Sequence, residues 1–423
     1  MDGRSSVAQI KLEMTSLSEE CDDVCPISMC PMTDPVFTAD GQKYDRASIE
    51  TWFRAGLELK HLDLVDAVAV DVVDHNMSGY HRAGWARAVA LLKLCFRAPA
   101  NAFDETVALD TFVDRTFLSG KTHARPWIGF VHHTFDESNS EHNCSEMFRS
   151  PAFVRSLSAY KGLIVMSNAM KIRIATKLVE IHLAELRVHF VRHPMDVVIG
   201  KEFTVAKFLE NPDKKVVHVG AWLRNPWSIY ELPVQERWNN PHRIRKAALR
   251  GRDMDAYFKP DGFARSLREH LHRHSGRSTG IQWPACRPGP VVNLYSSYMH
   301  DSIMAKDSSV RVIERLTDAE YDDLLDKNVV FLDMVDCSAA NTALECLVRN
   351  TPLFVNRLPA LEEVFGTDYP GFYENLVDAS LMVVDVAKIA RVHEHLAGLD
   401  KYPYASDVFV AAVRTIVEDA LRR

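Results

Sequence analysis

The sequence lacks a long apolar run. Its longest apolar stretches, such as Leu163–Met166 and Val329–Leu332, span only a few residues, whereas a membrane-spanning helix needs roughly 20 apolar residues. Residues 1–18 hold no apolar segment typical of a secretory signal. These two absences predict a cytoplasmic protein without a transmembrane segment.

Cysteine is scarce and scattered, with 8 residues among 423. Together with the absence of a signal, this predicts free thiols in a reducing compartment. Cys21, Cys25 and Cys30 lie close together, but their spacings are C-x3-C and C-x4-C and no histidine stands nearby at ligand spacing. Structural zinc sites usually pair C-x2–4-C with a second such set, so we predict no metal and no other cofactor.

An excess of positive charge is also lacking, because the formal net charge is −7. This balance predicts no nucleic-acid partner. The exception is the arginine- and lysine-rich segment 236–288, which we interpret as a basic insertion. It is either a solvated helical surface or a surface for a phosphate-rich or anionic partner.

What the chain does have is a globular composition, with 47% hydrophobic and 25% charged residues, and a length that suggests two or three domains. Beyond residue 60, short apolar runs alternate with amphipathic stretches, a pattern typical of βαβ units and parallel sheets. We expect strands at 64–73, 127–132, 162–166, 187–191, 215–220, 290–295, 310–313, 329–332, 352–355 and 380–384. We expect helices at 82–94, 150–158, 168–184, 318–326, 341–349, 359–365 and 406–422.

These patterns divide the chain into several parts. We expect a disordered tail at 1–24, two α/β halves at 60–195 and 215–395, a linker at 196–214, and a C-terminal helical region at 396–423.

Residues 25–54 form a separate motif. Its characteristic residues are CPI at 25–27, MTDPV at 32–36, DG at 40–41, YDR at 44–46, and Ile49 with Trp52 and Phe53. Pro35 and the Asp40-Gly41 turn predict a hairpin, and Asp45 can cap a helix that follows it. The segment resembles the first half of a U-box, a module of ubiquitin ligases.

The U-box resemblance implies a docking role for Ile27, because the apolar residue after Cys-Pro helps to bind a ubiquitin-conjugating enzyme. The family's second Cys-Pro loop and closing helix are not visible after residue 54, where the sequence continues as LELKHLDLVDAVAV from 57 to 70. A segment of about 30 residues buries too little surface to fold without support. We therefore predict that the segment is an evolutionary relic of a U-box or an arm that packs on the main domain. The alternative is a working ubiquitin ligase.

Polar residues follow several of the expected strands, where a parallel sheet places its ligands. His132 and His133 end the strand at 127–132, and Ser167 ends the next one. The two histidines either contact a sugar or acceptor hydroxyl or form a structural pair bonded to the backbone.

The second half carries the stronger pattern. The strand at 215–220 ends at Gly220, and Arg224 follows within reach of an anion. Near residue 341 a loop of small residues enters a helix, whose free amide groups suit a diphosphate. Glu345, one turn inside, either accepts hydrogen bonds from ribose hydroxyls or pairs with the helix dipole.

These elements, in this order, resemble the retaining glycosyltransferases of GT-B fold, family 4. The resemblance implies two Rossmann-like domains with a cleft between them and a C-terminal helix that crosses back. The small α+β N-terminal segment comes from the U-box resemblance. It also implies a nucleotide-sugar donor, no required metal, and retention of configuration.

The resemblance assigns roles to individual residues. Asn341 and Thr342 match the diphosphate loop, Glu345 matches the second glutamate of the E-x7-E element, and Ser167 and Gly220 lie near the donor. Arg224 matches the residue that neutralises the leaving diphosphate, and His132 or His133 matches a histidine near the donor sugar. The first glutamate of E-x7-E is replaced by Cys337, although Asp336 is adjacent.

The sequence therefore predicts transfer of a sugar from a nucleotide-diphosphate sugar to a glycan, lipid-linked or protein acceptor. Two alternatives remain open. One is a GT-B-like binding protein without activity, suggested by Cys337. The other is a U-box ubiquitin ligase, with a ubiquitin-conjugating enzyme as partner and the α/β body binding its substrates.

Overall fold

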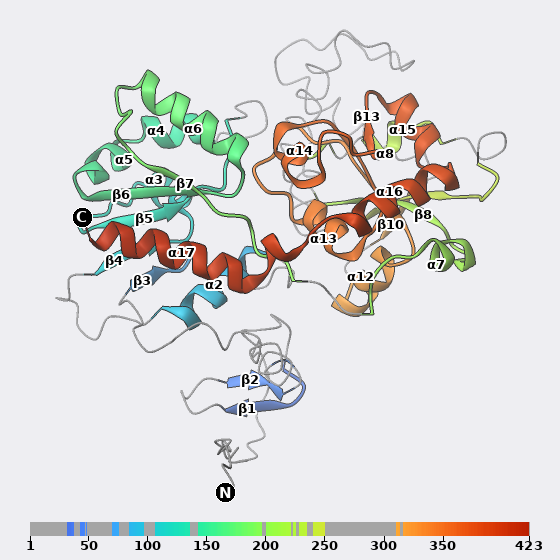
Figure 1. The fold of residues 1–423 in the computed structure, drawn as a ribbon, viewed down its shortest axis with the longest axis horizontal. Helices are drawn as coiled ribbons and strands as arrows, with labels where there is room; N and C mark the ends of the chain where they lie inside the picture. Colours follow the sequence, from blue (N-terminus) through green and yellow to red (C-terminus); the bar gives the residue numbers. More distant parts are fainter. Residues whose placement is uncertain are drawn as a thin grey trace, which may run out of the picture. The chain divides into compact units, whose positions relative to one another are not determined.

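A computed structural model describes most of the chain (Figure 1). The described residues are 32–37, 43–46, 48, 70–75, 84–96, 106–135, 143–196, 200–220, 223–225, 228–234, 240–249, 310–313 and 316–422. They belong to two compact units, one formed by residues 1–111 with 410–423 and the other by residues 112–409. Within the described ranges, no helix combines the length and the apolar character that crossing a bilayer requires.

The first unit contains the N-terminal hairpin. Strand β1 (Pro35–Phe37) pairs in antiparallel fashion with β2 (Lys43–Asp45). The Asp45 carboxylate accepts hydrogen bonds from the Thr33 amide at 2.7 Å and the Asp34 amide at 3.0 Å. Burial favours the neutral acid, but these bonds and one from the Ser48 amide hold the pKa of Asp45 below its ordinary value. The predicted hairpin and the capping role of Asp45 are confirmed, whereas Asp40-Gly41 and Ile27 lie outside the described residues.

The same unit holds a parallel pair, β3 (Val70–Val73) and β4 (Val107–Asp110), and helix α2 (Trp85–Cys95). It also includes residues 410–423, and so most of the last helix, α17 (Ser406–Leu421). Burial raises the pKa of the Cys95 thiol on α2 to about 11, and the charge of Arg414 on α17 partly offsets this. The predicted return of the C-terminal helix to the N-terminal part of the chain is confirmed.

The second unit begins with three parallel strands, β5 (Trp127–Phe130), β6 (Tyr160–Val165) and β7 (Val188–Phe190). Ser167 caps the longest helix of this part by accepting a hydrogen bond from the Met170 amide at 3.2 Å. The rings of Phe117 and Trp127 lie 5.2 Å apart and make part of the core. The helices here are α3 (Val113–Leu118), α4 (Cys144–Arg149), α5 (Pro151–Ser156), the short 3-10 turn Leu157–Ala159, and α6 (Asn168–Glu180).

The second unit continues into a six-stranded parallel sheet. Its spatial order is β10 (Val310–Ile313), β9 (Arg245–Leu249), β8 (Lys215–Val219), β11 (Val329–Leu332), β12 (Leu353–Asn356) and β13 (Phe372–Tyr373). If the six strands are numbered 1 to 6 along the chain, their spatial order is 3-2-1-4-5-6, which is the order of a dinucleotide-binding fold. In this order, successive strands are added on one side of β8 up to β10 and on its other side from β11 onward, so the reversal point lies between β8 and β11. The predicted α/β class with parallel sheets in both halves is confirmed.

Helices surround this sheet (Figure 1). They are α7 (Val205–Glu210), α8 (Ser228–Glu231), α12 (Asp318–Leu325), α13 (Asn341–Arg349), α14 (Pro359–Phe365), α15 (Leu376–Met382), α16 (Val386–Gly398) and the 3-10 turn Tyr402–Tyr404.

The structure corrects three expectations. The predicted strand at 380–384 is wrong, because Asn375 caps helix α15 by accepting a hydrogen bond from the Asp378 amide at 3.0 Å. The expected linker at 196–214 contains α7, anchored by the fully buried Phe203 and Phe208.

The third correction concerns the expected basic insertion at 236–288. It contains β9, a strand inside the sheet, so residues 245–249 are not part of an insertion. Residues 250–309, including the strand expected at 290–295, lie outside the described part.

Candidate functional site

The reversal point between β8 and β11 is built by a close pairing of the two segments that follow these strands. The Val335 amide donates to the Leu223 carbonyl at 2.8 Å, and the Asn225 amide donates to the Asp333 carbonyl at 2.7 Å. Between them Arg224 forms an antiparallel bridge with Met334. This pairing fixes the backbone of Arg224 at the carboxyl end of the sheet, where doubly wound folds bind their ligands.

Arg224 reaches from this pairing to the start of helix α13. Its Nη2 donates to the Thr342 hydroxyl at 3.1 Å. Gly220 has a φ of +80°, and a Cβ on it would lie 3.0 Å from the Cζ and Nη1 atoms of Arg224. Ala340, the residue before α13, offers no side chain to cap the first-turn amides.

The structure thus brings together four predicted residues, Gly220, Arg224, Asn341 and Thr342. A guanidinium next to an uncapped helix N-terminus is a favourable environment for a phosphate or diphosphate.

Glu345 is buried and bonded within the protein. Its side chain is only 2% exposed, and Oε2 accepts a hydrogen bond from the Tyr321 hydroxyl at 2.5 Å. Burial, and then the negative charge of Glu345, raise the pKa of Tyr321 well above its ordinary value. A role in ribose binding stays a prediction, and the observed role of Glu345 is to join α13 to α12.

Cys337 occupies the place of the first glutamate of E-x7-E as a buried thiol. Burial raises its pKa to about 12, so the side chain is neutral near pH 7. The neighbouring Asp336 does not replace it freely, because both carboxylate oxygens accept from Nη1 of Arg173 at 2.8 Å. The negative charge expected at this position is therefore absent at 337 and paired at 336.

The two predicted histidines follow β5 and share one buried carboxylate. Asp114 of α3 accepts from the His132 amide at 2.7 Å and from the His133 amide at 3.4 Å. The Nδ1 atom of His133 lies 3.8 Å from Asp114, and the His132 ring packs 4.2 Å from that of Phe112. Burial raises the pKa of Asp114. The backbone bonds support the structural reading of the pair, and sequence analysis missed Asp114 because nothing marks one buried aspartate on a short helix.

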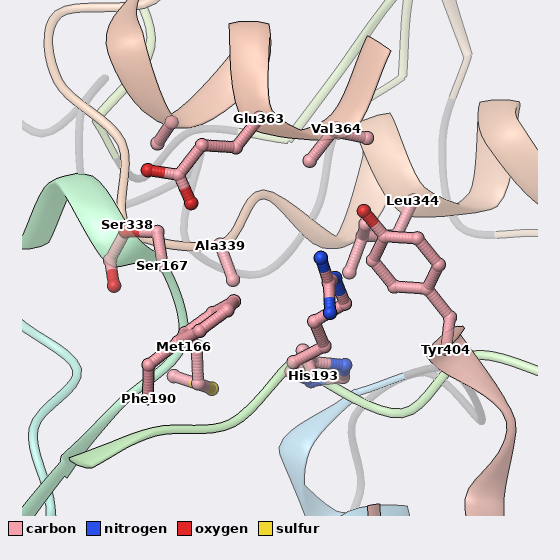
Figure 2. Close-up of a pocket in the computed structure, with 12 residues that line it drawn as sticks. Met166, Ser167, Phe190, His193, Ser338, Ala339, Leu344, Glu363, Val364 and Tyr404 are labelled. Atoms are coloured by element: carbon pink, nitrogen blue, oxygen red, sulfur yellow. The ribbon is translucent and has the colours of Figure 1, made fainter. Parts of the chain in front are cut away.

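A pocket of the second unit is lined by residues on both sides of Asn341 and Thr342, namely Ala339 and Leu344 (Figure 2). Figure 2 shows Ser167, Ser338, Glu363 and Tyr404 around it. Of the predicted site residues, Ser167 alone lines this pocket. Glu363 and Arg192 also line it, and sequence analysis missed both.

The pocket and the predicted diphosphate residues share an electrostatic environment. After burial, the charges of Arg224, Asp336 and Glu363 all act on the Cys337 thiol. Arg224 and Glu363 therefore both lie near the Cys337 thiol.

No group of three or more histidine, cysteine or carboxylate side chains suited to a metal occurs among the described residues. The cysteines at 21, 25 and 30 lie outside them. The absence of a metal requirement therefore stays a prediction.

Comparisons with known proteins add two findings. The U-box domain family matches residues 23–67, which confirms the N-terminal resemblance and extends it beyond residue 54. A search of curated proteins finds no match to the chain.

Solved structures with a similar fold include TarM from S. aureus in complex with fondaparinux, alpha-GlcNAc-glycerol and UDP. The identity is 9%, the TM-score is 0.46, and the match covers 92% of this chain and 64% of TarM, so the chain spans less than two thirds of that protein. A UDP-forming trehalose-phosphate synthase from Burkholderia xenovorans gives 11% identity, a TM-score of 0.47, and coverage of 92% and 90%. Sucrose-phosphate synthase from Thermosynechococcus elongatus gives 8% identity and a TM-score of 0.46, and the match covers 75% of this chain and 74% of that protein. Because these values are low, the function has to be inferred from the chain's own residues.

Proposed function

We propose that the chain is a glycosyltransferase of GT-B type that takes its sugar from a nucleotide-diphosphate sugar. The observation that carries the proposal is the contact of Arg224 with Thr342 at the uncapped start of α13, at the reversal point of a 3-2-1-4-5-6 sheet. Gly220 leaves the space that this arginine needs. Guanidinium and helix amides together match the geometry and charge of a diphosphate.

The same groups suit the chemistry of transfer. When the bond between sugar and diphosphate breaks, negative charge develops on the leaving diphosphate. Fixed donors aimed at that charge lower the barrier, because they need no reorganisation during the reaction. Arg224 and the first amides of α13 are such donors. We further propose retention of configuration, no metal requirement, and a glycan, lipid-linked or protein acceptor, as the GT-B resemblance implies.

Nucleotide binding gives the first test. The melting temperature of the full chain is measured with UDP, GDP and ADP and with their sugar conjugates. A ligand at about 100 times its Kd adds roughly 2.7 kcal/mol to the free energy of unfolding, so one base should give a clear upward shift. If no nucleotide shifts the transition, the proposal is wrong. A shift without hydrolysis or transfer of the sugar would instead identify a binding protein, as the neutral Cys337 thiol allows.

A second candidate function is favoured by the family match at residues 23–67 and by the β1–β2 hairpin with its Asp45 cap. This is ubiquitin ligation through a bound ubiquitin-conjugating enzyme. We expect autoubiquitination with some member of a panel of conjugating enzymes and its loss in Ile27→Ala. Arg224→Ala should leave the signal unchanged, because Arg224 belongs to the other compact unit. A signal that persists in Ile27→Ala would exclude the docking role of Ile27.

A further inference from the structure

One of the chain's own carboxylates sits on the N-terminus of helix α6. Glu363 of α14 accepts hydrogen bonds from the Asn168 amide at 2.7 Å and from the Ala169 amide. The first turn of a helix carries free N–H groups and a partial positive charge, and it therefore attracts anions. In this structure the anion comes from another helix of the same chain, 195 residues further along the sequence.

Ser338 supplies an independent sign that the pocket takes a ligand. Its side chain is only 6% exposed and lines the pocket with Glu363. Within the described part of the chain, its hydroxyl has no hydrogen-bond partner. Leaving a buried hydroxyl unsatisfied is unfavourable. A ligand oxygen in the pocket would remove this cost.

Arg192 gives the pocket a positive charge. Its guanidinium lies 5.3 Å from the centre of the Phe190 ring and 5.8 Å from that of Tyr404, the range of cation–π contacts. No carboxylate among the described residues lies within ion-pair distance of it. A guanidinium presents a planar fork of donors to a phosphate.

The pocket as it stands has little free space. Its volume is about 20 Å³, which is room for roughly one water molecule. Figure 2 shows the Glu363 carboxylate directed toward Ser167 and Ser338. The side chain of Glu363 is exposed, so it can leave this place by rotating about its own bonds.

We propose that this pocket binds a phosphate group and that the Glu363 carboxylate occupies the place of that group until the ligand displaces it. The amides of Asn168 and Ala169, the Ser338 hydroxyl and the Arg192 guanidinium are the donors. The inference deepens the proposed function by placing in this pocket either a phosphate of the donor's diphosphate or the phosphate of a phosphorylated acceptor. Phosphate binding itself does not depend on sugar transfer.

Inorganic phosphate is the probe, titrated calorimetrically into the full chain at constant ionic strength. Glu363→Gln removes the competing charge, so phosphate should bind at least about tenfold tighter than to the natural chain. Adding Arg192→Gln to that variant should weaken binding about tenfold or more, because hydrogen bonds to charged groups contribute about 1.5–3 kcal/mol and 1.4 kcal/mol is about tenfold. Ser338→Ala, which removes a single hydroxyl, should weaken binding in the same background and keeps the test valid if the Arg192 variant misfolds.

Glu362→Gln is the matched control. Glu362 lies on the same helix but pairs with Arg357 at 2.6 Å, and its loss should leave phosphate affinity unchanged. The proposal is overturned if Glu363→Gln binds phosphate no tighter than the natural chain, or if Arg192→Gln has no effect. Repeating the titration with saturating nucleoside diphosphate separates the sources. If the nucleoside diphosphate competes with inorganic phosphate, the site belongs to a donor phosphate. If the chain binds the two ligands together, the site belongs to a phosphorylated acceptor. A chain that binds phosphate here but no nucleotide would refute the proposed function and leave this inference standing.

Discussion

Replacing Arg224 by alanine is expected to lower the rate of sugar transfer by about 100- to 1,000-fold, the usual effect of removing one donor to a developing negative charge. The affinity for a nucleoside diphosphate should fall less, by about 10- to 100-fold, because charge-assisted hydrogen bonds contribute about 1.5–3 kcal/mol. The larger effect on rate follows because negative charge on the diphosphate increases as the sugar departs. Calorimetric affinity and turnover, measured on one preparation, check both values.

Gly220 allows the same contact to be disturbed without touching Arg224. Gly220→Ala would bring a Cβ within 3.0 Å of the guanidinium and strain a backbone with φ of +80°. Gly200 has the same φ, but a Cβ there would meet nothing within 4 Å. Gly200→Ala therefore reproduces the backbone strain alone.

We expect nucleoside diphosphate affinity to fall in Gly220→Ala and to stay unchanged in Gly200→Ala. Equal affinities in the two variants would show that the position of Arg224 does not matter for binding. An Arg224→Ala variant with normal turnover would remove the central observation of the proposed function.

The ends of two elements that meet at the reversal point, the strand before Gly220 and the helix near Asn341, could be predicted from the sequence because their signals are local. Gly220 ends a buried β-branched strand, and the small residues before Asn341 enter an amphipathic helix. A positive φ and an uncapped helix start are both properties of neighbouring residues. The GT-B resemblance assigned Arg224 and Thr342 to the donor diphosphate. The structure brings the two side chains into contact although 118 positions separate them, and their roles stay predictions.

Elements without such local signals were missed. Strand β9 reads RKAAL, which consists of good helix formers, yet it is buried between β8 and β10. There Lys246 donates from Nζ to the Tyr230 carbonyl. The run at 380–384 is apolar like a strand, but the Asn375 cap starts a helix before it. Tertiary pairing and capping override propensity in these two cases.

The pocket residues were missed for a related reason. Glu363 looks like an ordinary exposed helix residue, and its partners, the amides of Asn168 and Ala169, carry no side-chain signature. Asp114 likewise bonds to the backbone of His132 and His133. Contacts between a carboxylate and distant backbone amides cannot be predicted from residue type or spacing, because every residue except proline has such an amide.

A buried ion pair joins helices α12 and α13. Arg349, in the last turn of α13, is paired through Nη2 with Asp322 of α12 at 2.7 Å, and the two side chains are only 1% and 6% exposed. Asp322→Ala leaves the Arg349 charge buried without its partner, which should reduce the free energy of unfolding by about 3–5 kcal/mol.

Asp323 provides the matched control because it is the next residue on the same helix. Its side chain is 52% exposed and pairs with Lys201, so Asp323→Ala should reduce the free energy of unfolding by less than about 1 kcal/mol. Urea denaturation of the full chain measures both changes. The double change Asp322→Ala with Arg349→Met should recover much of the loss, because it removes the stranded charge and keeps an apolar side chain of similar length. If Asp322→Ala destabilises the chain no more than Asp323→Ala does, water or another group reaches Arg349, and the start of α13 does not depend on this pair for its support.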